Sequence, residues 1–391
     1  MKKFNKNILY LGIAFLLIAI GFNGVQQYLT SYFSDLGYIS IGFNSLIIIY
    51  FFFAISSPIS SIFVSKYGAK KSMILASIFY SLFIFSVIDK NILLIYLSSA
   101  LLGIAAALIW TGQGTYLIRA SEKTNFGKNA GIFTTTFFLG TAIGIFTLGF
   151  LIEKISFQLS FTIFLLFPLL GFLTFFKLKD IKTNQQIKNR FNLVKKSIKS
   201  LTALKLSSIW FSQSFVFGLS LGLIPLTIKN ILGITFVSIL LPLFYIMPIL
   251  FSYLFGKQSD KIGRGKSIFF SYALGAIGLI LIYFSTKTSI ILGVLLLALS
   301  FASLKIVTFA LPGDISQDHN LEFLTGLFWM IQNIGTLLAL LISRFIQSNI
   351  AYIISLIILI ISLVIVLSVF KLKFSKEKFE DIKEKLSNEI R

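Results

Sequence analysis

The sequence contains no cysteine, a single histidine and few charged residues, and each shortage excludes a class of protein. Without cysteine the chain has no disulfide bonds, and with His319 alone it has no histidine-rich metal site. Charged residues make up 13% of the chain and hydrophobic residues 56%. Soluble domains are roughly one-quarter charged. The composition therefore excludes a water-soluble globule.

Acidic residues are much scarcer than basic ones, with 14 Asp and Glu against 35 Lys and Arg and a net charge of +21. The basic residues lie mainly in short segments between long apolar runs. This placement follows the positive-inside rule of membrane proteins and argues against a nucleic-acid partner. We expect the partners to be a lipid bilayer and a small-molecule solute.

Twelve apolar runs are long enough to cross a bilayer as helices. Their continuous apolar character excludes a transmembrane β-barrel, in which apolar residues alternate with polar ones. The predicted spans are 8–33, 41–64, 72–88, 91–118, 130–152, 157–176, 206–228, 234–256, 267–286, 289–311, 324–346 and 349–370.

The distribution of Lys and Arg predicts the orientation of the chain. Of the 35, 29 fall on the side of the N-terminus and five on the other side, with Lys305 inside a span. This asymmetry predicts a multi-pass protein of the plasma membrane with both termini in the cytoplasm. The first apolar run is too long for a secretory signal and is interpreted as the first membrane helix.

The two halves of the chain repeat each other at a separation of 195 residues. The segment Lys66–Lys71 recurs as Lys261–Lys266, and Tyr50 recurs as Tyr245. We therefore predict an all-α integral membrane protein whose 12 helices form two parallel six-helix repeats around a central cavity. The predicted units are an N-terminal half (1–176), a basic linker (177–205), a C-terminal half (206–370) and an amphipathic cytoplasmic tail (371–391).

The linker and the tail are expected to contact the membrane surface. The linker is strongly basic, which suits anionic lipid headgroups. In the tail, Phe374, Phe379, Ile382 and Leu386 recur at helical spacing among charged residues, which favours an amphipathic surface helix.

The segment GKQSDKIGRGK, from Gly256 to Lys266, resembles the loop signature of the major facilitator superfamily. With twelve helices and duplicated halves, this resemblance covers nearly the whole chain and implies a transporter fold. In that family the loop is associated with conformational switching, so the residues implied in gating are Lys66, Gly68, Lys71, Gly256, Asp260, Lys261, Gly263, Arg264 and Lys266. An acid such as Asp260 can pair with cations or with helix-end amides. Because Ser65 stands at the equivalent position of the first half, the latch there must be weaker or built differently.

A second resemblance covers the stretch from Gly103 to Phe133, which is similar to the "uncoordinated" ion-channel-regulator branch of the superfamily. Some members of that branch are regarded as regulatory partners. This implies an alternative function, a membrane regulatory or scaffold protein that transports nothing. The Gly-Pro pair typical of drug antiporters is absent from the fifth span, which makes drug export less favoured.

Several polar and aromatic residues inside the spans are candidates for a solute site, since polar side chains in lipid usually face the bundle interior. The candidates are Asn23, Gln26, Gln27, Trp110, Gln113, Tyr116, Gln213, Lys305, Trp329, Gln332 and Asn333. The alternative is that the amides make hydrogen bonds between helices.

Lys305 is the most distinctive candidate. Its side chain either extends to the nearby helix end or forms a buried cation for an anionic ligand. The leading prediction is secondary or facilitative transport of a small solute by alternating access, with an anion among the candidates. We expect a monomer without a cofactor or metal, and no enzyme, because the spans contain no paired acids or nucleophile–base arrangement.

Overall fold

Long apolar stretches of this chain form helices because a bilayer offers no partners for free backbone groups. The computed structural model describes residues 6–181, 189–221, 223–233, 236, 239–346, 348–370 and 376–390. Within them, eleven helices are long and apolar enough to cross a membrane. Helix α12 (Leu243–Ile262) stands where the span 234–256 was predicted. It is not among the eleven, and its last turns carry the charged residues Lys257, Asp260 and Lys261. The predicted all-α membrane fold is confirmed.

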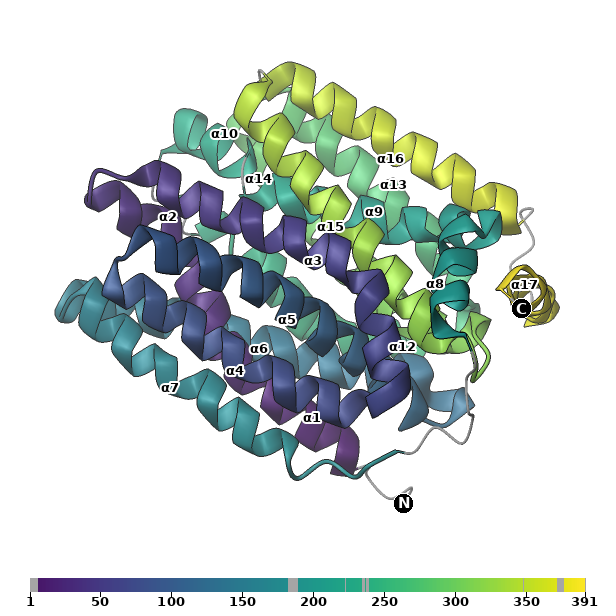
Figure 1. The fold of residues 1–391 in the computed structure, drawn as a ribbon. Coiled ribbons are helices and arrows are strands. Elements are labelled where there is room, and N and C mark those ends of the chain that lie inside the picture. The colour runs from purple at the N-terminus through teal and green to yellow at the C-terminus, as the bar shows by residue number, and fades with distance from the viewer. Residues whose placement is uncertain are drawn as a thin grey trace.

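The helices of the two halves follow each other in the expected order (Figure 1). The N-terminal half contains α1 (Lys6–Ile18), η1 (Ala19–Asn23), α2 (Gly24–Asp35), α3 (Ile39–Tyr67), α4 (Ala69–Asp89), α5 (Ile92–Arg119), η2 (Lys123–Asn125), α6 (Phe126–Lys154) and α7 (Phe157–Phe175). The C-terminal half contains α9 (Leu201–Leu221), α10 (Leu223–Leu232), α12, α13 (Arg264–Tyr283), α14 (Lys287–Ile315), α15 (Leu321–Phe345) and α16 (Ser348–Phe370).

Alternate turns lie at opposite ends of the bundle. One end contains the start of α1 and the turns α3–α4, α5–α6, α12–α13 and α14–α15; we call it the basic end, after its many Lys and Arg residues. The turns at Gly68 and Gly263 correspond in the repeat and share a positive φ, 91° and 93°. This backbone conformation favours glycine.

The halves meet along two helix pairs. Helix α6 of the first half packs against α12 of the second, and α3 packs against α15. These pairs correspond to each other in the repeat, so the interface has approximate two-fold symmetry.

Part of the predicted linker is a helix that packs on the protein. Helix α8 (Arg190–Lys199) contacts α3, α9 and α15, and Val194 is buried beside Phe323. Helix α9 begins at Leu201, five residues before the predicted span. Protein covers only part of the apolar side chains of α8, since Phe191 and Ile198 are exposed.

The tail forms the helix α17 (Lys376–Ile390), which lies near α8 at the basic end (Figure 1). Its apolar residues Ile382, Leu386 and Ile390 are buried, and it contacts α8, α9 and α14. The predicted helix is present, but its apolar face packs on the bundle instead of lipid. Phe374 lies outside the described residues.

Glu389 fastens α17 to the start of α9. Its carboxylate accepts hydrogen bonds from the hydroxyls of Ser200 and Thr202, the latter at 2.6 Å, and from the Thr202 backbone N–H at 3.2 Å. A carboxylate at a helix N-terminus is favoured by the free N–H groups and the helix dipole. Burial alone would raise the pKa of Glu389, but these hydrogen bonds outweigh it and hold the pKa below its ordinary value.

We predict that Glu389→Ala releases α17 and exposes it to proteases. The pKa of Glu389 is lower in the folded protein than its ordinary value of 4.5, so the ionised carboxylate stabilises the folded state at neutral pH. This stabilisation is lost as the pH falls through the lower folded pKa. Limited proteolysis at neutral pH should cut α17 faster in Glu389→Ala than in the control Glu384→Ala, which changes an exposed acid of the same helix. Equal cutting rates in the two variants would contradict this anchoring role.

Candidate functional site

A cavity of about 200 Å³ lies between the two halves. Its wall includes residues of α3 and α5 from the first half and of α9, α14 and α15 from the second. The lining residues lie along the middle of the bundle and toward the end opposite the basic end. Sites at repeat interfaces near the middle of the membrane are typical of secondary transporters.

Nine of the eleven candidate residues from the sequence line this cavity. They are Asn23, Gln26, Gln27, Trp110, Gln213, Lys305, Trp329, Gln332 and Asn333. Gln113 and Tyr116 do not. Gln113 is fully buried elsewhere in the bundle and its amide has no hydrogen-bond partner in the described residues, whereas the Tyr116 hydroxyl donates to the Lys179 carbonyl at 2.9 Å.

A turn of π-helix places the polar residues of the first span. The turn η1 ends at Asn23, whose amide donates to the Thr141 hydroxyl of α6 at 2.8 Å. Such turns interrupt the regular helix repeat and are frequent at functional sites. Here the turn immediately precedes Gln26 and Gln27 in the cavity wall.

The repeat-related tyrosines Tyr50 and Tyr245 hold these two glutamines. The Gln26 amide donates to the Tyr50 hydroxyl at 3.0 Å within the first half. The Tyr245 hydroxyl donates to Gln27 Oε1 at 3.2 Å, and this bond joins the two halves. These tyrosines were not among the predicted site residues, although their repetition among apolar residues was a usable signal.

Aromatic rings form the wall of the cavity nearest the basic end. The ring centroids of Trp110 and Trp329 are 4.9 Å apart, and those of Trp110 and Phe137 are 5.2 Å apart. The ammonium group of Lys305 lies 4.8 Å from the ring centroid of Phe309 and 5.1 Å from that of Trp329. With 6% of its surface exposed, Lys305 therefore turns into the bundle and does not extend to the helix end.

Toward the basic end, the two halves close on each other through glycines. Helices α6 and α12 approach so closely at Gly127 and Gly256 that a Cβ at Gly127 would lie 2.7 Å from the Gly256 carbonyl oxygen. Nearby, a Cβ at Gly131 would lie 2.8 Å from the Ser252 carbonyl oxygen. Any side chain here would push the halves apart, so the glycines permit this closed contact.

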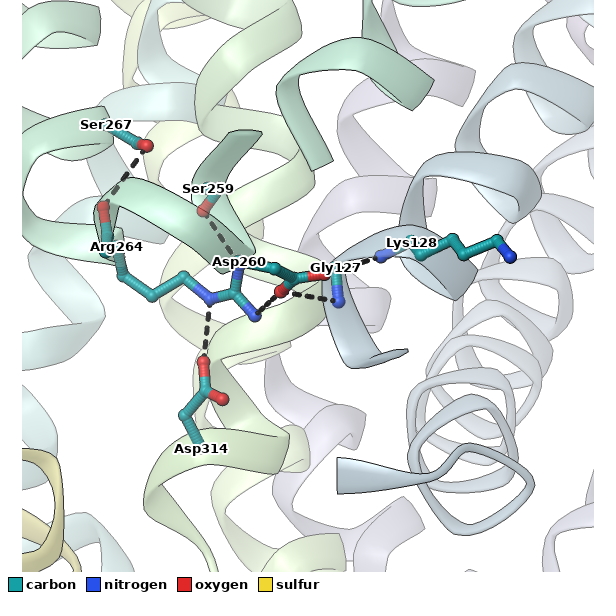
Figure 2. A network of polar contacts seen from close by, with 8 residues as sticks. Gly127, Lys128, Ser259, Asp260, Arg264, Ser267 and Asp314 are labelled. Carbon is teal, nitrogen blue, oxygen red and sulfur yellow. Dashed lines mark hydrogen bonds and ion pairs between the residues drawn. The ribbon is translucent and has the colours of Figure 1, made fainter. Parts of the chain in front are cut away.

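Asp260 joins α12 to the N-terminus of α6 (Figure 2). Its Oδ1 accepts from the Gly127 N–H at 3.3 Å, and its Oδ2 accepts from the Lys128 N–H at 3.1 Å. The same carboxylate pairs with Arg264 at 2.6 Å. We expected helix-end amides or cations as partners of this acid, and the carboxylate contacts both: the N–H groups that begin α6 and the guanidinium of Arg264.

Arg264 continues the network within the C-terminal half. Its Nε donates to Asp314 at 2.7 Å and its Nη1 to the Ser259 hydroxyl at 2.8 Å (Figure 2). The guanidinium is 5% exposed and thus holds two carboxylates in a largely dry position. Such charge-assisted hydrogen bonds are roughly twice as strong as neutral ones.

A separate ion pair connects the two halves. Arg119, the last residue of α5, pairs at 2.5 Å with Glu322 in the first turn of α15. The Glu322 side chain is fully buried, and neither of its oxygens has a hydrogen-bond partner of good geometry in the described residues. Within the described residues, Arg119 is the cation that pairs with this buried acid.

The remaining gating candidates surround this closed contact. Gly68 and Gly263 form the positive-φ turns, while Lys66, Lys71, Lys261 and Lys266 are exposed. These four lysines make no ion pair with the part of the chain that the structure describes. Ser65, which replaces the acid of the first half, accepts a hydrogen bond from Arg190 of α8 at 3.1 Å.

Comparisons of sequence identify relatives among UNC93-like proteins and among MFS-type transporters. Residues 206–390 match the profile of the Major Facilitator Superfamily. The UNC93-like protein MFSD11 of Xenopus tropicalis is 37% identical over 130 residues, which cover 32% of this chain and 29% of that protein. The uncharacterized MFS-type transporter MJ1560 of Methanocaldococcus jannaschii is 26% identical over 357 residues, covering 86% of this chain and 89% of that protein.

Solved structures share the whole fold at low sequence identity. The bacterial homologue of the iron transporter ferroportin, in an outward-facing state, superposes with a TM-score of 0.75 and covers 94% of this chain and 99% of that one. The human organic anion transporter MFSD10 (TETRAN) gives a TM-score of 0.72, with 92% of this chain and 99% of that one covered. Both are 12% identical, so the likeness concerns the fold.

The profile of the family described as ion channel regulatory protein UNC-93 matches residues 38–289, which run from the second span of the first half into the second half. The MFSD11 match spans less than one-third of that relative's length, but the family profile covers well over half of this chain. The chain therefore belongs to the UNC-93 family and has the fold of major facilitator superfamily transporters.

Proposed function

We propose that this protein is a secondary or facilitative transporter that moves a small solute across a membrane by alternating access. The observation that carries the proposal is the arrangement of the cavity. It lies between two repeats, extends toward one end of the bundle, and is closed at the basic end by contacts between α6 and α12. The fold and the similarity to a protein named as a transporter support it.

The nature of the closing contacts suits a reversible gate. They consist of glycine contacts, one carboxylate on two backbone N–H groups, and the Arg119–Glu322 pair. Such contacts have discrete partners that are lost together when the helices separate, which gives a two-state element. In the opposite state of this proposal, the halves separate at the basic end and meet at the other end.

The basic end is proposed to face the cytoplasm. The excess of Lys and Arg on the side of the termini supports this orientation. The cavity then opens to the outside in this structure.

The rival function is regulation of an ion channel, which the description of the UNC-93 family favours. The two functions differ in whether solute crosses the membrane. Purified protein in liposomes should give saturable flux of at least one solute from a broad panel. The absence of flux, together with stable co-purification of a channel subunit in mild detergent, would favour regulation.

We predict that Asp260→Asn opens the basic end. The variant loses the negative charge at the α6 N-terminus and the ion pair with Arg264, and a lost cap costs about 1 kcal/mol, or roughly a fivefold shift in population. Since the chain lacks cysteine, Ser252→Cys at the α6–α12 contact provides a single reactive site. Its labelling by a maleimide should accelerate about fivefold in the Asp260→Asn background.

Two variants control this experiment. Asp260→Glu keeps the charge, and Lys257→Gln removes a charge from an exposed position of the same helix. Both should label at close to the parent rate. An unchanged labelling rate in Asp260→Asn would show that this acid does not hold the gate closed.

We predict that Arg119→Met lowers the unfolding temperature of the purified protein strongly, because it leaves the buried Glu322 without a counter-charge. Breaking a buried pair from one side costs about 3–5 kcal/mol. The double variant Arg119→Met/Glu322→Gln removes both charges and should recover most of the loss. If the double variant is no more stable than the single one, the pair is not coupled in this way.

A further inference from the structure

Lys305 is a buried cation without an anionic partner. Its ammonium group lies over the rings of Phe309 and Trp329, and it makes no ion pair or hydrogen bond within the described residues. Burying a charge is costly unless it is paired, and two cation–π contacts offset only part of that cost. The site around Lys305 is therefore electrostatically incomplete.

The described lining of the cavity contains no group that completes it. Among the described residues that line it, Lys305 is the one that carries a charge, and none is Asp or Glu. The acids Asp314, near the end of α14, and Glu322, in the first turn of α15, are already engaged, by Arg264 and Arg119 respectively. A molecule that enters the cavity can supply the counter-charge, and one cation calls for a single negative charge.

The shape and chemistry of the wall indicate the rest of that molecule. A cavity of about 200 Å³ is much larger than an inorganic ion, and Trp110, Trp329 and Phe137 present ring surfaces to it. Aromatic rings pack favourably on one another in stacked or edge-to-face arrangements. Gln213 and Gln332 also line the cavity, and their side-chain oxygens have no hydrogen-bond partner in the described residues.

We propose that the cavity binds a small planar organic monoanion, whose carboxylate pairs with Lys305 and whose ring packs among Trp110, Trp329 and Phe137. This inference names the substrate class of the proposed transport function and rests on that function only for movement across the membrane. Binding itself is tested without flux.

The test uses three probes of similar size that differ in charge at neutral pH: benzoate, benzamide and benzamidine. Binding is measured by titration calorimetry and thermal unfolding in discs of neutral phosphatidylcholine, so that no anionic lipid competes. Benzoate should bind saturably and at least tenfold more tightly than benzamide, and benzamidine should bind more weakly still. Equal affinities, or no saturable benzoate binding by folded protein, would overturn the proposal.

Substitutions assign the preference to the side chain. Lys305→Met should remove the preference for benzoate, and Lys305→Arg should retain it. Lys205→Met, which changes a lysine outside this cavity, should bind as the parent does. Because Lys305→Met removes an unpaired buried charge, the empty variant should unfold at a temperature no lower than the parent. Undiminished benzoate preference in folded Lys305→Met would refute the assignment.

The outcomes separate this inference from the proposed function. Flux of a neutral solute by a protein that ignores benzoate would retain transport and reject the anion site. Charge-selective benzoate binding by a protein without flux of any solute would retain the site and reject transport.

Discussion

The contact between α6 and α12 at the basic end is the constraint on which the arrangement of this molecule depends. Gly127 and Gly256 let the two backbones touch, and Asp260 places its carboxylate on the N–H groups that begin α6. With this contact made, the halves are joined at one end and the cavity extends toward the other. The Asp260 carboxylate finds its backbone donors in the opposite half, and a bilayer could not provide such donors.

The repeat explains why the second closing contact is built differently. Arg119 corresponds to Asp314 at the 195-residue separation, and Gly127 corresponds to Glu322. In the second half Arg264 binds Asp314, whereas Ala69 replaces that arginine in the first half. Since Ser65 also replaces Asp260, the α3–α4 turn lacks counterparts of both Asp260 and Arg264. Arg119 instead reaches across to Glu322, an acid already in the first turn of α15, so each interface places one carboxylate at a helix N-terminus.

The helices were predictable because they follow from local composition, and the repeat because matching residues recur 195 positions apart. Most of the cavity residues were also predictable, since polar side chains in apolar helices favour the interior. The exclusion of Gln113 was not, because α5 is apolar on every side and its pattern does not show which face meets the cavity. The direction of Lys305 was open for a related reason: its flexible stem suits either the helix end or the cavity.

Partners distant along the chain were harder to predict. The bond between Asp260 and Gly127 joins residues of opposite halves, and only the packing of α6 on α12 brings them together. The tail shows the same limit, because the apolar residues of α17 suit lipid and protein equally. The hydrogen bonds of Glu389 to the start of α9 fix α17 against the protein.

Distances between spin labels at the two ends test the account most directly. One pair, on Lys128 and Lys257, spans the α6–α12 contact at the basic end; another, on Lys154 and Ile239, spans the opposite end. Double electron–electron resonance should give two populations, one short at the basic end and wide at the other, and one with these relations reversed. A single population at both ends, whatever solute is present, would contradict alternating access.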